Sequence, residues 1–141
     1  TVPPPAFVTF DAPDRERCRA RRARTNTPLQ ALVLMNSPTY VEAARAMAER
    51  MMTEAGRDPG QRIRYGFRLA TARNPAPAEL EVLLDIAQQQ LDDYRADKDA
   101  AVQLLAVGES EYNRKLDVSE LAAWTTVANT ILNLDETITK E

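Results

Sequence analysis

The sequence contains no histidine and only one cysteine, and these two shortages remove several classes of chemistry. Histidine is the commonest general base and metal ligand, and it activates the nucleophile in Ser-His and Cys-His pairs. A single cysteine, Cys18, permits neither an internal disulfide nor a thiolate metal cluster. The sequence therefore predicts no catalytic residue, no metal site and no cofactor within these residues, and it argues against an enzyme.

Glycine and long apolar runs are scarce as well. Four glycines in 141 residues disfavour a turn-rich β sandwich and a glycine-cradled nucleotide site. No apolar run approaches the ~20 residues that span a bilayer, so we expect no membrane span. The chain is 44% hydrophobic and 28% charged, which is typical of one globular domain with a substantial core.

Helix signals dominate after residue 24. Ser37 followed by Pro38 combines a capping side chain with a proline at the first helical position, where its missing N–H costs nothing. Asp58 and Pro59 repeat this pattern further along the chain. Apolar residues recur at i, i+3, i+4 and i+7 over most of the remaining length. The pattern predicts an all-α fold, a four- to five-helix bundle with an extended N-terminal arm.

The element boundaries follow from the same signals. Residues 1–24, rich in proline and arginine, are expected to form the arm, and residues 25–141 a single helical domain. The longest helix is expected over about 77–107, because its apolar residues keep an almost unbroken 3.5-residue spacing. Ser119 is expected to cap the last helix, and Trp124 to lie in the core.

Charge is divided unevenly along the chain. Residues 1–74 hold 13 arginines against 7 acids, whereas residues 75–141 hold 14 acids against 5 bases. Six arginines fall within ten residues, and with two nearby aromatic residues they are the candidate interaction site: Phe7, Phe10, Arg15, Arg17, Arg19, Arg21, Arg22 and Arg24.

Three partners suit these arginines. They can pair with acids of the second half or of an upstream domain, or they can bind the oxyanions of an acidic or sulfated glycan. Nucleic acid is the least favoured partner, because no aromatic side chains are interleaved for base stacking and the net charge is −3. Charge pairing within the polypeptide is the preferred interpretation.

Other candidate residues have plainer explanations. The polar group Thr25, Asn26, Thr27, Pro28 and Gln30 has the chemistry of a helix cap and turn, and this structural role is preferred to a small binding site. The acids over 92–99 are interpreted as a solvated helix face, because they lack the spacing of a calcium-binding loop. For Cys18, packing is preferred to a reactive thiol.

Several motifs resemble one known family. The stretches RTNTPLQAL at 24–32, NSP at 36–38 and VEAAR at 41–45, together with TFDAPDR at 9–15, are similar to the C-terminal part of a planctomycete-specific domain of unknown function found in planctomycete cytochrome-c-like proteins. The resemblance implies a large exported parent in the periplasm or cell envelope. It also implies that haem c, where present, is bound elsewhere in that parent, and that the partners are upstream domains of the same polypeptide.

Two functional hypotheses follow. The first is a helical, non-catalytic docking or structural module at the C-terminal end of a larger exported protein. The second is the C-terminal portion of an envelope enzyme that acts on polysaccharide or sulfated glycan, with its catalytic residues upstream.

Overall fold

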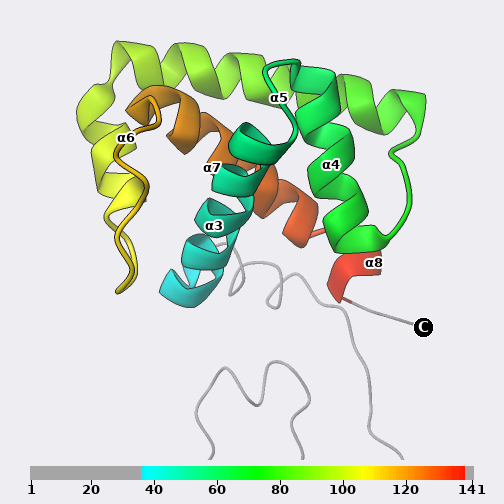
Figure 1. Cartoon of the computed structure of the whole chain (residues 1–141), viewed down its shortest axis with the longest axis horizontal. Coiled ribbons are helices and arrows are strands. Elements are labelled where there is room, and N and C mark those ends of the chain that lie inside the picture. The colour runs from blue at the N-terminus through cyan, green and yellow to red at the C-terminus, as the bar shows by residue number, and fades with distance from the viewer. Residues whose placement is uncertain (1–35, 139–141) are drawn as a thin grey trace, which may run out of the picture.

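The computed structural model describes residues 36–138, and within this range the chain forms helices and no strands (Figure 1). The all-α prediction is therefore confirmed. The helices in chain order are α3 (Pro38–Glu54), α4 (Pro59–Thr71), α5 (Pro77–Ala96), α6 (Lys98–Leu105), α7 (Val118–Leu132) and the short α8 (Asp135–Ile138).

Three of these helices begin at a proline. Pro38, Pro59 and Pro77 each occupy the first turn, where the absent N–H would have had no partner in the helix. Asp58 adds a side-chain cap to α4, because its Oδ2 accepts a hydrogen bond from the Gln61 backbone N–H at 2.8 Å. The predicted starts at 38 and 59 are thus confirmed, but the predicted capping by the Ser37 side chain is wrong, because it makes no capping hydrogen bond.

The centre of the fold is α7, which lies beneath α5 and behind α3 in Figure 1 and also packs against α4 and α6. Its buried residues point in all directions around the helix, which is typical of a helix surrounded by others. Trp124, only 5% exposed, lies in this core as predicted. The buried residues of α7 are Ser119, Leu121, Ala122, Ala123, Trp124, Thr125, Val127, Ala128 and Ile131.

The helix predicted over 77–107 is not continuous, because the chain bends at Asp97. The backbone of Asp97 leaves helical geometry at φ −128° and ψ 85°, and its carboxylate accepts a hydrogen bond from the Ala100 N–H at 3.0 Å. A straight helix over that span would be about 45 Å long, far longer than α7. The bend returns Ala101 and Leu105 to the core, where both are buried.

Replacing Asp97 with alanine is expected to lower the free energy of unfolding by about 1 kcal/mol, the usual cost of losing an N-cap side chain. Urea denaturation followed by circular dichroism would measure the change. Asp97→Asn is the matched control, because its amide oxygen still caps α6, and it should stay close to wild type. Equal losses in both variants would contradict the capping role.

The predicted cap of the last helix was also wrong by two residues. Asp117 caps α7, because its Oδ1 accepts from the Glu120 N–H at 2.8 Å. Ser119 lies inside the helix and is buried, where its hydroxyl donates to the Tyr94 carbonyl at 3.0 Å. It therefore joins α7 to α5.

None of the helices described is long and apolar enough to cross a membrane.

Candidate functional site

The segment between α6 and α7, residues 106–117, is held against α3 by a buried arginine. Arg45 is only 2% exposed, and its guanidinium donates hydrogen bonds to three backbone carbonyls around the end of α6. Nη1 reaches the carbonyls of Leu105 at 2.5 Å and Val107 at 2.8 Å, and Nη2 reaches that of Ser110 at 2.6 Å. The fork of the guanidinium fits this task because it offers five donors in a fixed plane.

Two carboxylates of α3 hold the same segment from either side of Arg45. Glu42 Oε1 accepts a hydrogen bond from the Ser110 N–H at 2.6 Å, and Glu49 Oε1 accepts one from the Asn113 N–H at 2.8 Å. Hydrogen bonds from Ser110, with a smaller contribution from Arg45, hold the pKa of Glu42 below its ordinary value. We call Glu42, Arg45 and Glu49 the α3 clamp.

The clamp also explains a glycine. Gly108 has a φ of +96°, a conformation that side chains disfavour, and a Cβ on it would lie 2.8 Å from Glu42 Oε2. Gly108 therefore lets the backbone approach the clamp closely.

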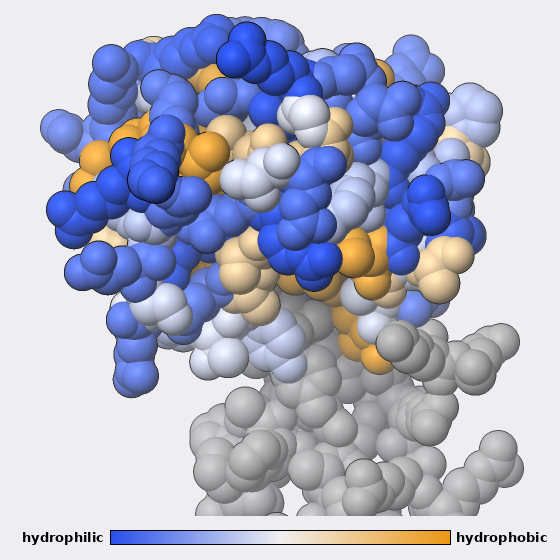
Figure 2. Space-filling view, in the orientation of Figure 1, coloured by the Kyte–Doolittle hydropathy of each residue, from blue (hydrophilic) through white to orange (hydrophobic). Residues whose placement is uncertain are grey.

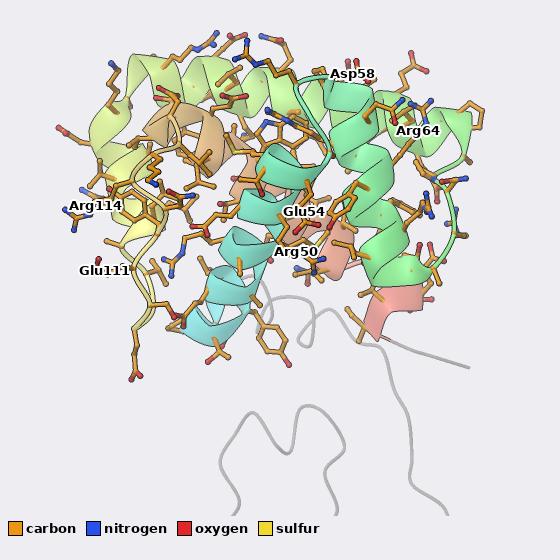
Figure 3. All side chains as sticks on the ribbon, in the orientation of Figure 1. Arg50, Glu54, Asp58, Arg64, Glu111 and Arg114 are labelled. Atoms are coloured by element: carbon orange, nitrogen blue, oxygen red, sulfur yellow. The ribbon has the colours of Figure 1, made fainter. Side chains whose placement is uncertain are left out.

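The clamp contacts the backbone of the segment and leaves its charged side chains outside. Glu109, Glu111, Arg114 and Lys115 are all exposed, and none of them forms an ion pair with a residue in the range 36–138. Figure 3 shows Glu111 and Arg114 pointing away from the body of the protein. We call residues 109–115 the display loop, because its backbone is fixed while its charges face solvent.

The second buried arginine, Arg62, joins α4 to α7. Its Nη1 lies 2.5 Å from Glu120 Oε1, and its Nε donates to the Gly56 carbonyl at 2.7 Å. The guanidinium also lies over the Trp124 ring, 5.4 Å from the centroid, a favourable cation–π position. Arg62 therefore stabilises the packing of α4 against α7.

A third arginine, Arg73, joins the α4–α5 corner to α8. It makes a two-pronged contact with Glu79, at 2.8 and 2.9 Å, and a second one with Glu136. Its guanidinium stacks over the Phe67 ring at 4.7 Å. Hydrogen bonds from Arg73, and then from the Ala76 backbone N–H, lower the pKa of Glu79 to about 2.

This corner is expected to weaken in acid. A carboxyl whose pKa is lower in the folded state stabilises the fold above its ordinary pKa of 4.5, and that stabilisation disappears as the pH falls towards 2. Arg73→Gln should therefore lower the thermal midpoint at pH 6 and lower it much less at pH 2. Arg68→Gln is the control, because Arg68 forms no ion pair in the part of the chain described. An equal loss at both pH values would contradict the role of the ion pair.

The outer faces of α3 and α4 are joined by a smaller exposed cluster. Arg50 donates to the Tyr65 hydroxyl at 2.9 Å and to Glu54 at 3.2 Å, and the Tyr65 hydroxyl donates to Glu54. The hydrogen bond to Glu54 raises the pKa of Tyr65, and that of Glu54 is lowered, first by Tyr65 and then by Arg50. Figure 3 shows Arg50 and Glu54 together between the two helices. Each member of this cluster has a partner.

The residues proposed from the sequence lie elsewhere. Phe7, Phe10, the arginines of 15–24, Cys18 and the polar group of 25–30 all lie outside the residues that the structure describes. The acids over 92–99 are exposed, as expected of a solvated helix face. No group of three or more acidic or sulfur side chains within 36–138 is placed to hold a metal ion.

The α3 clamp was missed by sequence reasoning, although one signal was present. Arg45 follows Val41 by four residues and precedes Ala48 by three, so it falls on the apolar face of α3. An arginine at such a position is buried only when its donors are satisfied. Its partners, however, are backbone carbonyls 60 or more residues away.

Comparison with known proteins places the chain in a family. No curated protein and no solved structure matches it. A family model does match, over residues 1–87, which cover the N-terminal segment, α3, α4 and the first half of α5. This match spans more than half of the 141 residues, and the chain therefore belongs to PSD1, a family described as protein of unknown function (DUF1553).

Proposed function

We propose that this chain is a non-catalytic docking module of a larger exported protein, and that the display loop is its contact surface. The observation that carries the proposal is the α3 clamp. The buried Arg45 makes three hydrogen bonds that fix the backbone of the connection between α6 and α7. The four charged side chains of the display loop form no ion pair within 36–138. A loop that is already ordered loses little entropy when it binds, which favours recognition.

The identity of the partner rests on the sequence motifs. The resemblance to planctomycete cytochrome-c-like proteins supports a parent with upstream domains, and those domains are the proposed partner. The display loop carries two acids followed by two bases, so the matching surface would carry the opposite charges in the same order. Such complementarity sets orientation and the rate of association more than affinity.

The experiment is calorimetric titration of the chain with the separately expressed upstream part of the parent polypeptide, at low and high salt. Binding that weakens in high salt is expected. The double variant Glu111→Lys with Arg114→Glu keeps the net charge but makes the acids and bases alternate, and it should weaken binding about tenfold or more. Its matched control, Asp93→Lys with Arg95→Glu on α5, also keeps the net charge and should bind normally.

Two results would overturn the proposal. Absence of binding by the wild-type chain at low salt would rule out docking to the upstream domains. Equal weakening in the loop variant and the α5 control would show that the display loop is not the contact surface. Binding of dextran sulfate through the display loop, in place of the upstream domains, would instead support a portion of a glycan-acting enzyme.

A further inference from the structure

The exposed side of α4 carries a basic stripe that no acid in the described part of the chain neutralises. Its members are Arg57, just before the helix, followed by Gln61, Arg64 and Arg68, at intervals of four, three and four residues. Gln61, Arg64 and Arg68 lie within α4, and their spacing places them along one face of the helix, whereas Arg57 precedes its N-cap. All four are exposed, and the arginines form no ion pair with any residue of 36–138. Figure 3 shows Arg64 on the outer side of α4.

The exposed side of α5 carries an acidic stripe with the same intervals. Its members are Glu81, Asp85, Gln88 and Asp92, again separated by four, three and four residues. Each of them is exposed, and Gln88 donates to both oxygens of Asp92 at 3.1 Å. No basic residue within 36–138 forms an ion pair with these three acids.

The two stripes match when one helix is reversed. In an antiparallel arrangement Gln61 faces Gln88, Arg64 faces Asp85, and Arg68 faces Glu81. Arg57, one residue before the N-cap of α4, precedes this match on the side of Asp92. Each of these three positions then meets a complementary side chain over about 10 Å of helix, at the α-helical rise of 1.5 Å per residue. Within one molecule the two stripes do not pair, because Phe67 of α4 and Leu83 of α5 turn the inner faces of these helices into the shared core.

Two exposed apolar side chains reinforce this register. Leu69 is 44% exposed and Val82 is 58% exposed. Leu69 directly follows Arg68 in the sequence and Val82 directly follows Glu81, the two residues of the last matched pair. In antiparallel helices the residues that follow paired positions lie on the same flank of the contact. Leu69 and Val82 therefore meet beside the Arg68–Glu81 pair. Figure 2 shows a mostly hydrophilic surface with small apolar patches on the face that it presents.

From this match we infer that the chain associates with a second copy of itself, α4 of one copy lying antiparallel along α5 of the other. The occupant follows from charge complementarity, because the second copy offers acids at the spacing that the basic stripe requires. Exposed ion pairs contribute little individually and are screened by salt. The association is therefore weak and reversible, and it responds strongly to ionic strength.

Sedimentation equilibrium of the full chain at 20 and 500 mM salt is the test. We expect self-association at low salt that weakens about tenfold or more at high salt. Arg64→Glu with Arg68→Glu makes both stripes acidic, and Glu81→Lys with Asp85→Lys makes both basic. Each double variant alone should be monomeric. An equimolar mixture of the two should associate, since each then supplies the stripe that the other lacks.

Matched controls change the net charge equally at the display loop. Arg114→Glu with Lys115→Glu corresponds to the acidic variant, and Glu109→Lys with Glu111→Lys corresponds to the basic one. Both controls should associate like the wild type, and circular dichroism would show that all variants are folded. A wild-type chain that stays monomeric at low salt would overturn the inference. A mixture of the two variants that fails to associate would also overturn it. Loss of self-association in the α5 variant but not in the α4 variant would overturn it as well, because the acidic stripe would then bind another basic partner.

Discussion

A fragment ending at Ala87 is expected to be unfolded, although it contains every residue that the family model matches. The fragment keeps α3, α4 and half of α5 but loses α7, against which both α3 and α5 pack. Each large apolar side chain that α7 buries is worth about 1.5–3 kcal/mol. The loss of Leu121, Val127 and Ile131, all fully buried, would by itself approach the whole stability of a typical domain, about 5–15 kcal/mol.

Circular dichroism and thermal melting would measure this outcome. We expect little helix and no cooperative transition for residues 1–87. Residues 25–141 are the control, because they retain the whole helical domain proposed from the sequence and should melt cooperatively. A cooperative transition in the 1–87 fragment would contradict the central role of α7. If residues 25–141 also showed no cooperative transition, the proposed boundary at residue 24 would be unsupported.

Features of the fold that depend on local chemistry could be predicted from the sequence. The start of α4 follows from Asp58-Pro59, because the side-chain cap and the fixed φ of proline act within a few residues. The start of α3 follows from Pro38 alone, since Ser37 makes no side-chain capping hydrogen bond. The bend at Asp97 could not be predicted in this way. The apolar spacing misses only Lys98 and resumes at Ala101, and the choice between a straight and a bent helix depends on packing of α6 against α7.

The candidate site was harder to predict than the fold for a similar reason. The sequence directed attention to the arginines of 15–24, because a dense run of one charge is conspicuous in a sequence. The α3 clamp has no such signature, since Arg45 binds backbone carbonyls and any residue provides one. In the segment that Arg45 binds, only Gly108 indicates a close approach of the backbone, and a glycine at that position is equally typical of a helix end.

Replacing Arg45 with methionine is expected to release the display loop and to destabilise the fold by about 3 kcal/mol or more, because hydrogen bonds to charged groups are worth about 1.5–3 kcal/mol each. Methionine fills much of the same space but leaves the carbonyls of Leu105, Val107 and Ser110 without their donor. Glu42 would also lose the positive charge that lies 3.6 Å away.

Hydrogen exchange distinguishes release of the loop from general loss of stability. In Arg45→Met the backbone N–H groups of Ser110 and Asn113, which bind the two clamp carboxylates, should exchange far faster than those in the middle of α7. Arg45→Lys keeps the positive charge but lacks the planar fork of the guanidinium. Its exchange rates at Ser110 and Asn113 should lie between those of Arg45→Met and the wild type. Arg114→Met, on the exposed loop itself, should change stability by no more than about 0.5 kcal/mol. Unchanged protection at Ser110 in Arg45→Met would show that the two carboxylates hold the loop without the arginine, and the clamp would then reduce to Glu42 and Glu49.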